Sequence, residues 1–426
     1  MNRRTFLQTS SAFMLSQFFP KTVLGQLLAM QKKNFLIIRA HQGMDNLAGL
    51  NPWLESSFDP EKLFVDYSPS DVLRNIEGTQ ISLGPAAYNL SPFAKQMTVI
   101  NGVVMGASDL GHPLAMQYST SGRIQETAPH LVSMLASHSG MGRILSDSAP
   151  QIRNCHVEIL NGQDTKKYGL QSNSQSSILN LYKKRNSAHQ AQEKYNSQKF
   201  IIEQTSEVYK SIHGDDSNQA NQKYTNDDIV ISGFKSGLFS FAQLNWDSGF
   251  KNMDNHFNYS GDHIAAQKER WDRLARLLNH LKNLNILENT LVMVVTEFTR
   301  TPKLNVNKGK DHNYGDNSVL LVGGCGLQGG RVIGDRRLVT SDFDPNVTEF
   351  IGDFIHYGNS NIQGRGDVYK VEGVRSPEVF NNPQFSQEYD LIRPSNVVAT
   401  VLGHLSPQNT QLFESGIPLI PGLFQV

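Results

Sequence analysis

The sequence contains few cysteines: Cys155 and Cys325 are the two among 426 residues. Two cysteines set no disulfide framework, which excludes the small secreted domains that depend on several bridges. Cys325 follows an apolar run that reads as a strand, and free buried cysteine is common in such places. We therefore expect no disulfide between them.

An excess of charge of either sign is also absent. The chain has 39 basic and 39 acidic residues, and charged residues make up only 18%. This balance gives no reason to expect a nucleic acid or an anionic membrane surface as partner. Asn, Gln and Ser are conspicuous instead, so the surface is polar rather than ionic. The length allows a core of substantial size.

A membrane-spanning run is lacking at the N-terminus, although an export signal is recognisable there. Arg3 and Arg4 precede a weakly apolar run over residues 9–24, and residues 23–25 offer a cleavage site. The run is interrupted and too short to span a bilayer. We expect residues 1–25 to be a twin-arginine-type signal peptide, and the protein to be periplasmic or otherwise exported. An ordinary buried N-terminal helix is the alternative.

Strand and helix patterns alternate along the rest of the chain. Apolar strands are predicted at residues 34–41, 97–105, 156–160, 290–298 and 317–325, and helices at 128–139, 265–284 and 394–402. The alternation predicts a three-layer α/β/α fold with a mostly parallel sheet, in one domain over residues 26–426. Residues 163–225 are rich in Asn, Gln, Ser and Lys with helical spacing, which predicts a helical insert or cap, with disorder as the alternative.

The most informative stretch is 290–325, where two apolar strands are each followed by polar residues. Glu297 and Arg300 follow the first strand, and Asp311 and His312 come shortly after. Parallel strands in α/β sheets present ligand sites beyond their carboxyl ends, so these side chains are expected at a site. Arg300 is suited to bidentate binding of an anion. A surface salt bridge between Glu297 and Arg300 is the alternative.

Two further places carry carboxylates and histidines. Asp247, Asp254 and His256 fall within one Gly- and Asn-rich stretch, where oxygen and imidazole ligands suit a divalent cation. A polar loop that caps the next helix is the alternative, and His263 also lies in this region. Asp45 follows the first strand, which suits a metal ligand, although aspartate also caps turns for local reasons.

A weaker candidate is the segment 111–123. His112 could be a ligand or a substrate contact, but a lone histidine is more often structural. The hydroxyls of Ser119, Thr120 and Ser121 could act as nucleophiles only with a base or a metal close by.

Several of these motifs resemble one family. Trp246-Asp247, Glu297-Phe-Thr-Arg-Thr-Pro302 and Lys310-Asp-His312 are similar to the Trp-Asp-Thr-His, Glu-Phe-Gly-Arg-Thr-Pro and Gly-Arg-Asp-His patterns of the exported bacterial domain of unknown function 1501 family. That family looks like a branch of the alkaline phosphatase and sulfatase superfamily. The resemblance implies an alkaline phosphatase-like fold and metal-dependent hydrolysis or transfer of phosphate and sulfate esters.

The resemblance also implies a set of site residues. Asp45, Asp247, Glu297 and His312 would be metal ligands, with His256 in place of a missing histidine. Arg300 would act in catalysis by binding the anionic group. Asp311 is assigned to catalysis from its place beside His312 in the sequence, as a carboxylate that supports a ligating imidazole.

Three departures from the pattern stand beside this set. Phe298 occupies the place of the superfamily's Asp-His-Gly histidine, Ser248 and Gly249 replace Thr-His, and residues 42–44 offer no nucleophile.

The sequence thus supports two functions. The first is an exported hydrolase of sulfate or phosphate esters that holds a divalent metal (Zn, Mn, Mg or Ca) and acts on an anionic ester or glycan. The second is a catalytically degenerate envelope protein of the same fold that binds a glycan or a protein partner. The clustered carboxylates and Asp311-His312 favour the first, and the missing histidines favour the second.

Overall fold

The computed structural model describes most of the chain outside the N-terminus and the polar region. The described residues are 33–55, 59–105, 110–138, 143–146, 156–159, 225–236, 239–246, 250, 252–254, 256–259, 262–340, 348–352, 354–356, 389–407 and 417–425. The expected signal peptide, the insert expected at 163–225 apart from its last residue, and Cys155 lie outside them. Cys325 is buried, with a free thiol. Within the described residues, none of the helices is both long and apolar enough to cross a bilayer.

One eight-stranded sheet forms the middle layer. Its order is β10-β2-β9-β6-β1-β5-β3-β4, with bounds β1 Asn34–Ala40, β2 Met97–Ile100, β3 Arg143–Ser146, β4 His156–Ile159, β5 Phe241–Trp246, β6 Thr290–Thr296, β9 Val319–Gly323 and β10 Arg331–Ile333. All neighbours pair in parallel except β9, which is antiparallel to both β2 and β6. The predicted α/β fold with a mostly parallel sheet is therefore confirmed.

The direction of β9 corrects one expectation. The run at 317–325 is a strand, but it is antiparallel to its neighbours. The start of β9 therefore lies at the same edge as the carboxyl ends of β1 and β6. Asn317 shows this, because its side-chain amide donates to the carbonyl oxygen of Thr296 at 2.9 Å. Cys325 follows β9 and so lies at the opposite edge.

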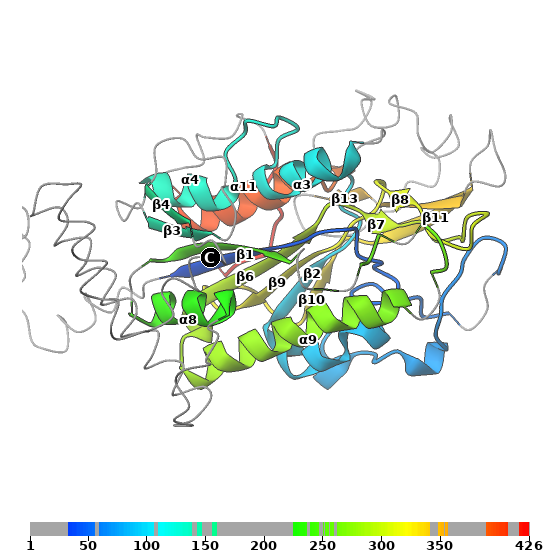
Figure 1. Cartoon of the computed structure of the whole chain (residues 1–426), viewed down its shortest axis with the longest axis horizontal. Helices are drawn as coiled ribbons and strands as arrows, with labels where there is room; N and C mark the ends of the chain where they lie inside the picture. The colour runs from blue at the N-terminus through cyan, green and yellow to red at the C-terminus, as the bar shows by residue number, and fades with distance from the viewer. Residues whose placement is uncertain are drawn as a thin grey trace, which may run out of the picture.

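Helices cover both faces of the sheet (Figure 1). One face carries α3 (Gly111–Ser121), α4 (Leu131–His138) and α11 (Pro394–Leu405), and the other carries α8 (Asn226–Ser236), α9 (Asp262–Asn283) and the 3-10 segment η3 (Pro85–Gln96). Successive side chains of a strand point to opposite faces. In β1, Leu36 and Ile38 join the core under α9, while Phe35 and Ile37 join the core under α4 and α11.

Helix α9 shows how the sequence pattern fixes an element. The stripe Trp271, Leu274, Leu278 and Leu281 is buried against the sheet, as the 3.6-residue period predicts. The predicted strand at 97–105 is shorter than expected, since β2 ends at Ile100. Gly102 takes a left-handed φ of +68°, which turns the chain out of the sheet.

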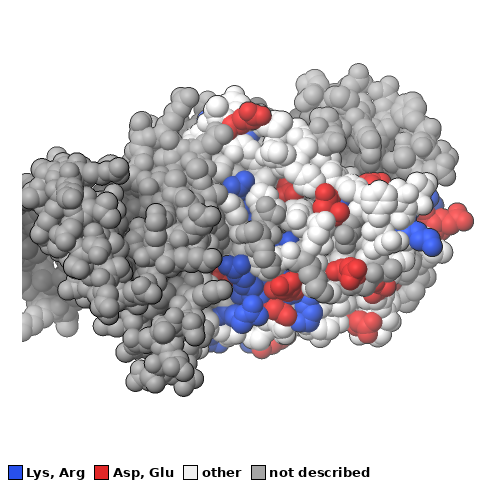
Figure 2. Space-filling view, viewed as in Figure 1, with Lys and Arg blue, Asp and Glu red and all other residues white. Residues whose placement is uncertain are grey.

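Short elements surround this framework. Three two-stranded ribbons are formed by β7 (Thr299–Arg300) with β8 (His312–Asn313), β11 (Arg336–Thr340) with β12 (Thr348–Gly352), and β13 (Phe354–His356) with β14 (Tyr389–Leu391). Further 3-10 turns are η1 (Pro69–Asp71), η2 (Ile76–Gly78) and η5 (Leu287–Asn289). On the described part of the face in Figure 2, basic and acidic side chains are interspersed, in keeping with the balanced composition.

Candidate metal centre

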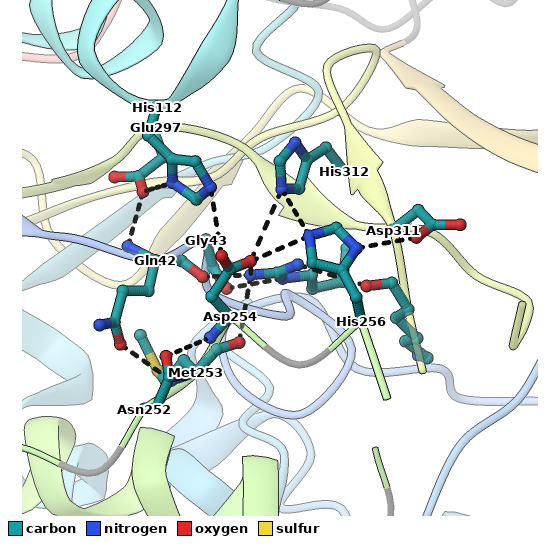
Figure 3. Close-up of polar contacts among 12 residues, drawn as sticks. Gln42, Gly43, His112, Asn252, Met253, Asp254, His256, Glu297, Asp311 and His312 are labelled. Atoms are coloured by element: carbon teal, nitrogen blue, oxygen red, sulfur yellow. Dashed lines mark hydrogen bonds and ion pairs between the residues drawn. The ribbon is translucent and has the colours of Figure 1, made fainter. Parts of the chain in front are cut away.

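Four segments that are distant in sequence meet beyond the carboxyl ends of β1 and β6 (Figure 3). They are the loop after β1, the first turn of α3 with His112, the segment after β5 with Asp254 and His256, and the segment after β6 with Glu297, Asp311 and His312. The predicted position of the site at the strand ends is where these side chains lie.

Three imidazoles share one arrangement, in which Nδ1 contacts an oxygen of a neighbouring side chain. His112 Nδ1 lies 2.6 Å from Oε1 of Glu297, and His256 Nδ1 lies 2.9 Å from Oδ1 of Asp311. His312 Nδ1 lies 3.2 Å from the Tyr314 hydroxyl. A partner at Nδ1 fixes the plane of each ring and leaves its Nε2 directed toward the centre.

The three Nε2 atoms meet at one carboxylate, Asp254. Its Oδ1 lies 3.1 Å from Nε2 of His256 and 3.6 Å from Nε2 of His312, and its Oδ2 lies 3.5 Å from Nε2 of His112. The Nε2 atoms of His256 and His312 are only 3.0 Å apart. Ligand atoms of His112, Asp254 and His312 all lie within 4.8 Å of one another, which is close enough for one metal ion.

Arg300 holds Asp254 in this position. Its Nη2 donates to Oδ1 of Asp254 at 2.8 Å and to the carbonyl oxygens of Met253, at 3.1 Å, and Gln42. Its other nitrogens donate to the carbonyls of Gly43 at 3.2 Å and Lys310 at 3.3 Å. The guanidinium is thus buried and committed to the protein, and a surface salt bridge between Glu297 and Arg300 is wrong because both residues are buried.

The charges around the site favour an anionic Asp254 beside a protonated His112. Hydrogen bonds from His112 and His312, together with Arg300, hold the pKa of Asp254 well below its usual range. Hydrogen bonds to Asp254 and Glu297 raise the pKa of His112 to about 9. Burial lowers the pKa of His312. The proton on His112 offsets the charge of the surrounding carboxylates, a role that a bound cation would take over.

Phe298, which stands where the resemblance drawn from the sequence expects a histidine, forms an apolar wall of the site. Its ring stacks on His312 at a centroid distance of 4.0 Å and meets the edge of His112 at 4.8 Å. The close approach of Phe298 requires glycine at position 43, where a Cβ would lie 2.4 Å from the ring and where φ is +67°. Phe298 therefore fixes the planes of two imidazoles but offers no ligand atom.

The sequence-predicted residues divide into three groups. His256, His312 and Asp311 come together as expected. Glu297 contacts Nδ1 of His112, so it lies on the side of this ring that faces away from Asp254. Asp45 bonds elsewhere, to Lys310 and Tyr259, and Asp247 lies outside the described residues.

Asp254 and His112 are two residues of the site that the sequence did not identify as ligands. Asp247, in the Trp-Asp pair that resembles the family motif, was preferred to Asp254 as a ligand, and a lone histidine such as His112 is more often structural. The feature that could have identified His112 as a site residue is its place at the start of α3, a helix that packs against β6.

Comparisons with known proteins agree with the resemblance drawn from the sequence. The model of the family described as protein of unknown function (DUF1501) matches residues 145–350. No curated protein matches the sequence of this chain.

Among solved structures, the lipoteichoic acid synthase LtaP from Listeria monocytogenes is 10% identical, with a TM-score of 0.34, over 72% of this chain and 68% of that one. A sulfatase from Pseudoalteromonas sp. is 10% identical, with a TM-score of 0.31, over 72% and 65%. The integral membrane lipooligosaccharide phosphoethanolamine transferase from Neisseria meningitidis is 10% identical, with a TM-score of 0.38, over 93% and 59%.

Proposed function

We propose that this chain is a metal-dependent hydrolase of sulfate or phosphate esters. Its centre would be formed by His112, Asp254, His256 and His312. The observation that carries the proposal is the shared geometry of the three imidazoles, each held at Nδ1 and directed with Nε2 toward one carboxylate. Metal-binding histidines are held in this way by carboxylates and hydroxyls behind the ring.

The residues present fit a divalent cation. Two imidazole nitrogens at 3.0 Å repel each other unless a proton or a cation lies between them. Imidazole nitrogen and carboxylate oxygen are ligands that zinc and manganese both accept. A bound metal ion would polarise the ester and lower the pKa of a water molecule at the site.

The side chains of the chain itself have distinct roles in this proposal. Arg300 keeps Asp254 ionised and oriented, so its contribution is positioning rather than the anion binding that the resemblance implied. Glu297 and Asp311 orient His112 and His256 in the same sense.

Water is the proposed nucleophile, because the hydroxyls of α3 are engaged elsewhere. Ser119 donates to the Thr296 carbonyl at 2.8 Å, Thr120 to that of Met116 at 2.9 Å, and Ser121 to that of Gln117 at 2.7 Å.

Export and substrate remain part of the proposal. The twin-arginine motif at the N-terminus supports action outside the cytoplasm, and the family resemblance drawn from the sequence supports an anionic ester or a glycan as substrate. The neutral surface gives no electrostatic reason for a nucleic acid.

Metal analysis and ester hydrolysis test the proposal together. Purified protein is expected to hold one zinc or manganese ion per chain and to hydrolyse an aryl sulfate or an aryl phosphate. His312→Ala is expected to lose both properties, while His280→Ala, on the last turn of α9, keeps both. Absence of metal from the wild type, with equal rates of ester hydrolysis for the wild type and His312→Ala, would refute the hydrolase proposal. The degenerate binding protein would then replace it, a function that the buried, committed Arg300 favours.

A further inference from the structure

Asp45 occupies the first-strand position that the resemblance assigns to a metal ligand, but its carboxylate is already satisfied. Oδ2 accepts from the Lys310 ammonium at 2.8 Å and from the Tyr259 hydroxyl at 2.5 Å. Oδ1 accepts the backbone N–H of Leu47 at 2.9 Å. Both acceptor positions of Oδ2 are therefore filled. Asp45 and Lys310 are both fully buried.

Lys310 is enclosed in a manner that suits a permanent cation. Its Nζ lies 4.6 Å from the ring centroid of Tyr259 and 5.9 Å from that of Phe64. Aromatic faces stabilise an ammonium group, and the carboxylate supplies the opposite charge that a buried cation needs. A metal ion at Asp45 would have to displace this ammonium into an apolar surrounding.

We infer that the Lys310 ammonium is the built-in cation of the Asp45 position, so that Asp45 binds no metal and the centre at Asp254 is the single metal centre among the described residues. The inference rests on the proposed function for the centre at Asp254, but the Asp45–Lys310 pair itself does not depend on it. It identifies Lys310 and Asp45 as positioning residues.

The pair acts on the centre through the chain. Lys310 immediately precedes Asp311, which contacts His256, and His312, which contacts Asp254. The Lys310 carbonyl also accepts from Nη1 of Arg300, the residue that holds Asp254. Fixing the Lys310 side chain against Asp45 therefore fixes the segment that carries His312 of the centre and Asp311, which orients His256.

A double-mutant cycle on the full chain tests the inference. Asp45→Asn and Lys310→Met each leave one buried charge without its partner, and the double variant removes both charges at similar volume. The measurements are melting temperature and zinc bound per chain in equilibrium dialysis. Lys268→Met with Asp272→Asn is the matched control, because that pair has an Nζ–Oδ2 distance of 2.6 Å but is partly exposed on α9.

We expect each single variant to melt at a clearly lower temperature and to bind zinc about 10- to 100-fold more weakly, as for residues that orient ligands. The double variant should regain much of both losses and bind one zinc ion per chain, as the wild type does. The control cycle should show no coupling.

Three results would overturn the inference. They are two zinc ions per chain in the wild type, loss of zinc from a folded double variant, and absence of coupling between Asp45 and Lys310. Where a single variant fails to fold, the melting temperature and zinc binding of the double variant still test the inference. A wild type that binds no zinc would refute the proposed centre alone, because the coupling in melting temperature would still test the pair.

Discussion

The contact at Nδ1 of each histidine sets the chemistry of the site at the scale of residues. Glu297 contacts Nδ1 of His112, and Asp311 contacts Nδ1 of His256 in the same way, but the two carboxylates differ in burial. The side chain of Glu297 is 0% exposed and that of Asp311 is 51% exposed. A buried charge interacts more strongly than an exposed one, because less water screens it. Glu297 should therefore matter more to the centre than Asp311.

The substitution Glu297→Gln tests this difference. Glutamine keeps an oxygen for the Nδ1 hydrogen of His112 but removes the charge that strengthens the ligand. We expect zinc affinity to fall about 10- to 100-fold, the usual effect of losing a carboxylate behind a ligating histidine. Asp311→Asn should lower it less. Titration calorimetry measures both, with the exposed Glu288→Gln as control. Equal affinities for the wild type and Glu297→Gln would show that Glu297 has no such role.

Residue types at strand ends could be predicted from the sequence, but their partners could not. Glu297, Asp311 and His312 follow an unmistakable buried strand. Asp254 and Asp247 differ little as sequence, because both stand in one stretch rich in Gly and Asn. Only the folded chain brings Arg300 to Asp254 and Lys310 to Asp45, across 46 and 265 residues. Such separations leave no periodic signal in the sequence.

At the scale of elements, a strand could be predicted from the sequence when all of its buried positions are apolar. The run in β6 is apolar and buried throughout, and it was predicted. Strand β5 was not predicted, because its buried positions include Gln243, which contacts Nδ1 of His130 at 2.9 Å. The antiparallel direction of β9 was not predicted either, for another reason. Strand direction depends on the connection between strands, and the local sequence of a strand looks alike in both directions.

The loop 305–309 packs at Gly309 against the segment 256–259, which carries His256 of the site. A Cβ at this position would lie 2.0 Å from the carbonyl carbon of His256 and 2.1 Å from its oxygen. Gly309→Ala must therefore push the segment 256–259 away from this loop. We expect it to lower the free energy of unfolding by about 1–3 kcal/mol, as overpacking does, and to weaken zinc binding.

Urea unfolding and equilibrium dialysis measure these two effects. Val306→Ala is the control in the same loop, since Val306 is 99% exposed and its loss should change stability by less than about 0.5 kcal/mol. A Gly309→Ala protein as stable as Val306→Ala, with unchanged zinc binding, would contradict the close packing of Gly309 against His256.

At the scale of the whole molecule, the centre joins parts of the chain that are distant in sequence and that folding brings together. His112 comes from α3 on one face, Asp254 and His256 follow β5, and His312 follows β6. Unfolding separates these ligands, so a metal ion that binds the folded chain must stabilise it. The stabilisation is about 2.7 kcal/mol when the free metal is at 100 times its dissociation constant.

We therefore expect zinc to raise the melting temperature of the wild type by several degrees, and a chelator to reverse the shift. His112→Ala should lose the shift, since one of the convergent Nε2 atoms is gone. His404→Ala is the matched control, because His404 stacks on Phe424 and contacts the Cys325 carbonyl, at the opposite edge of the sheet. Its own melting temperature is free to change, but the zinc-induced shift should remain. Equal shifts in both variants would place the bound zinc away from the four segments, because only ligands shared among them couple binding to the stability of the whole fold.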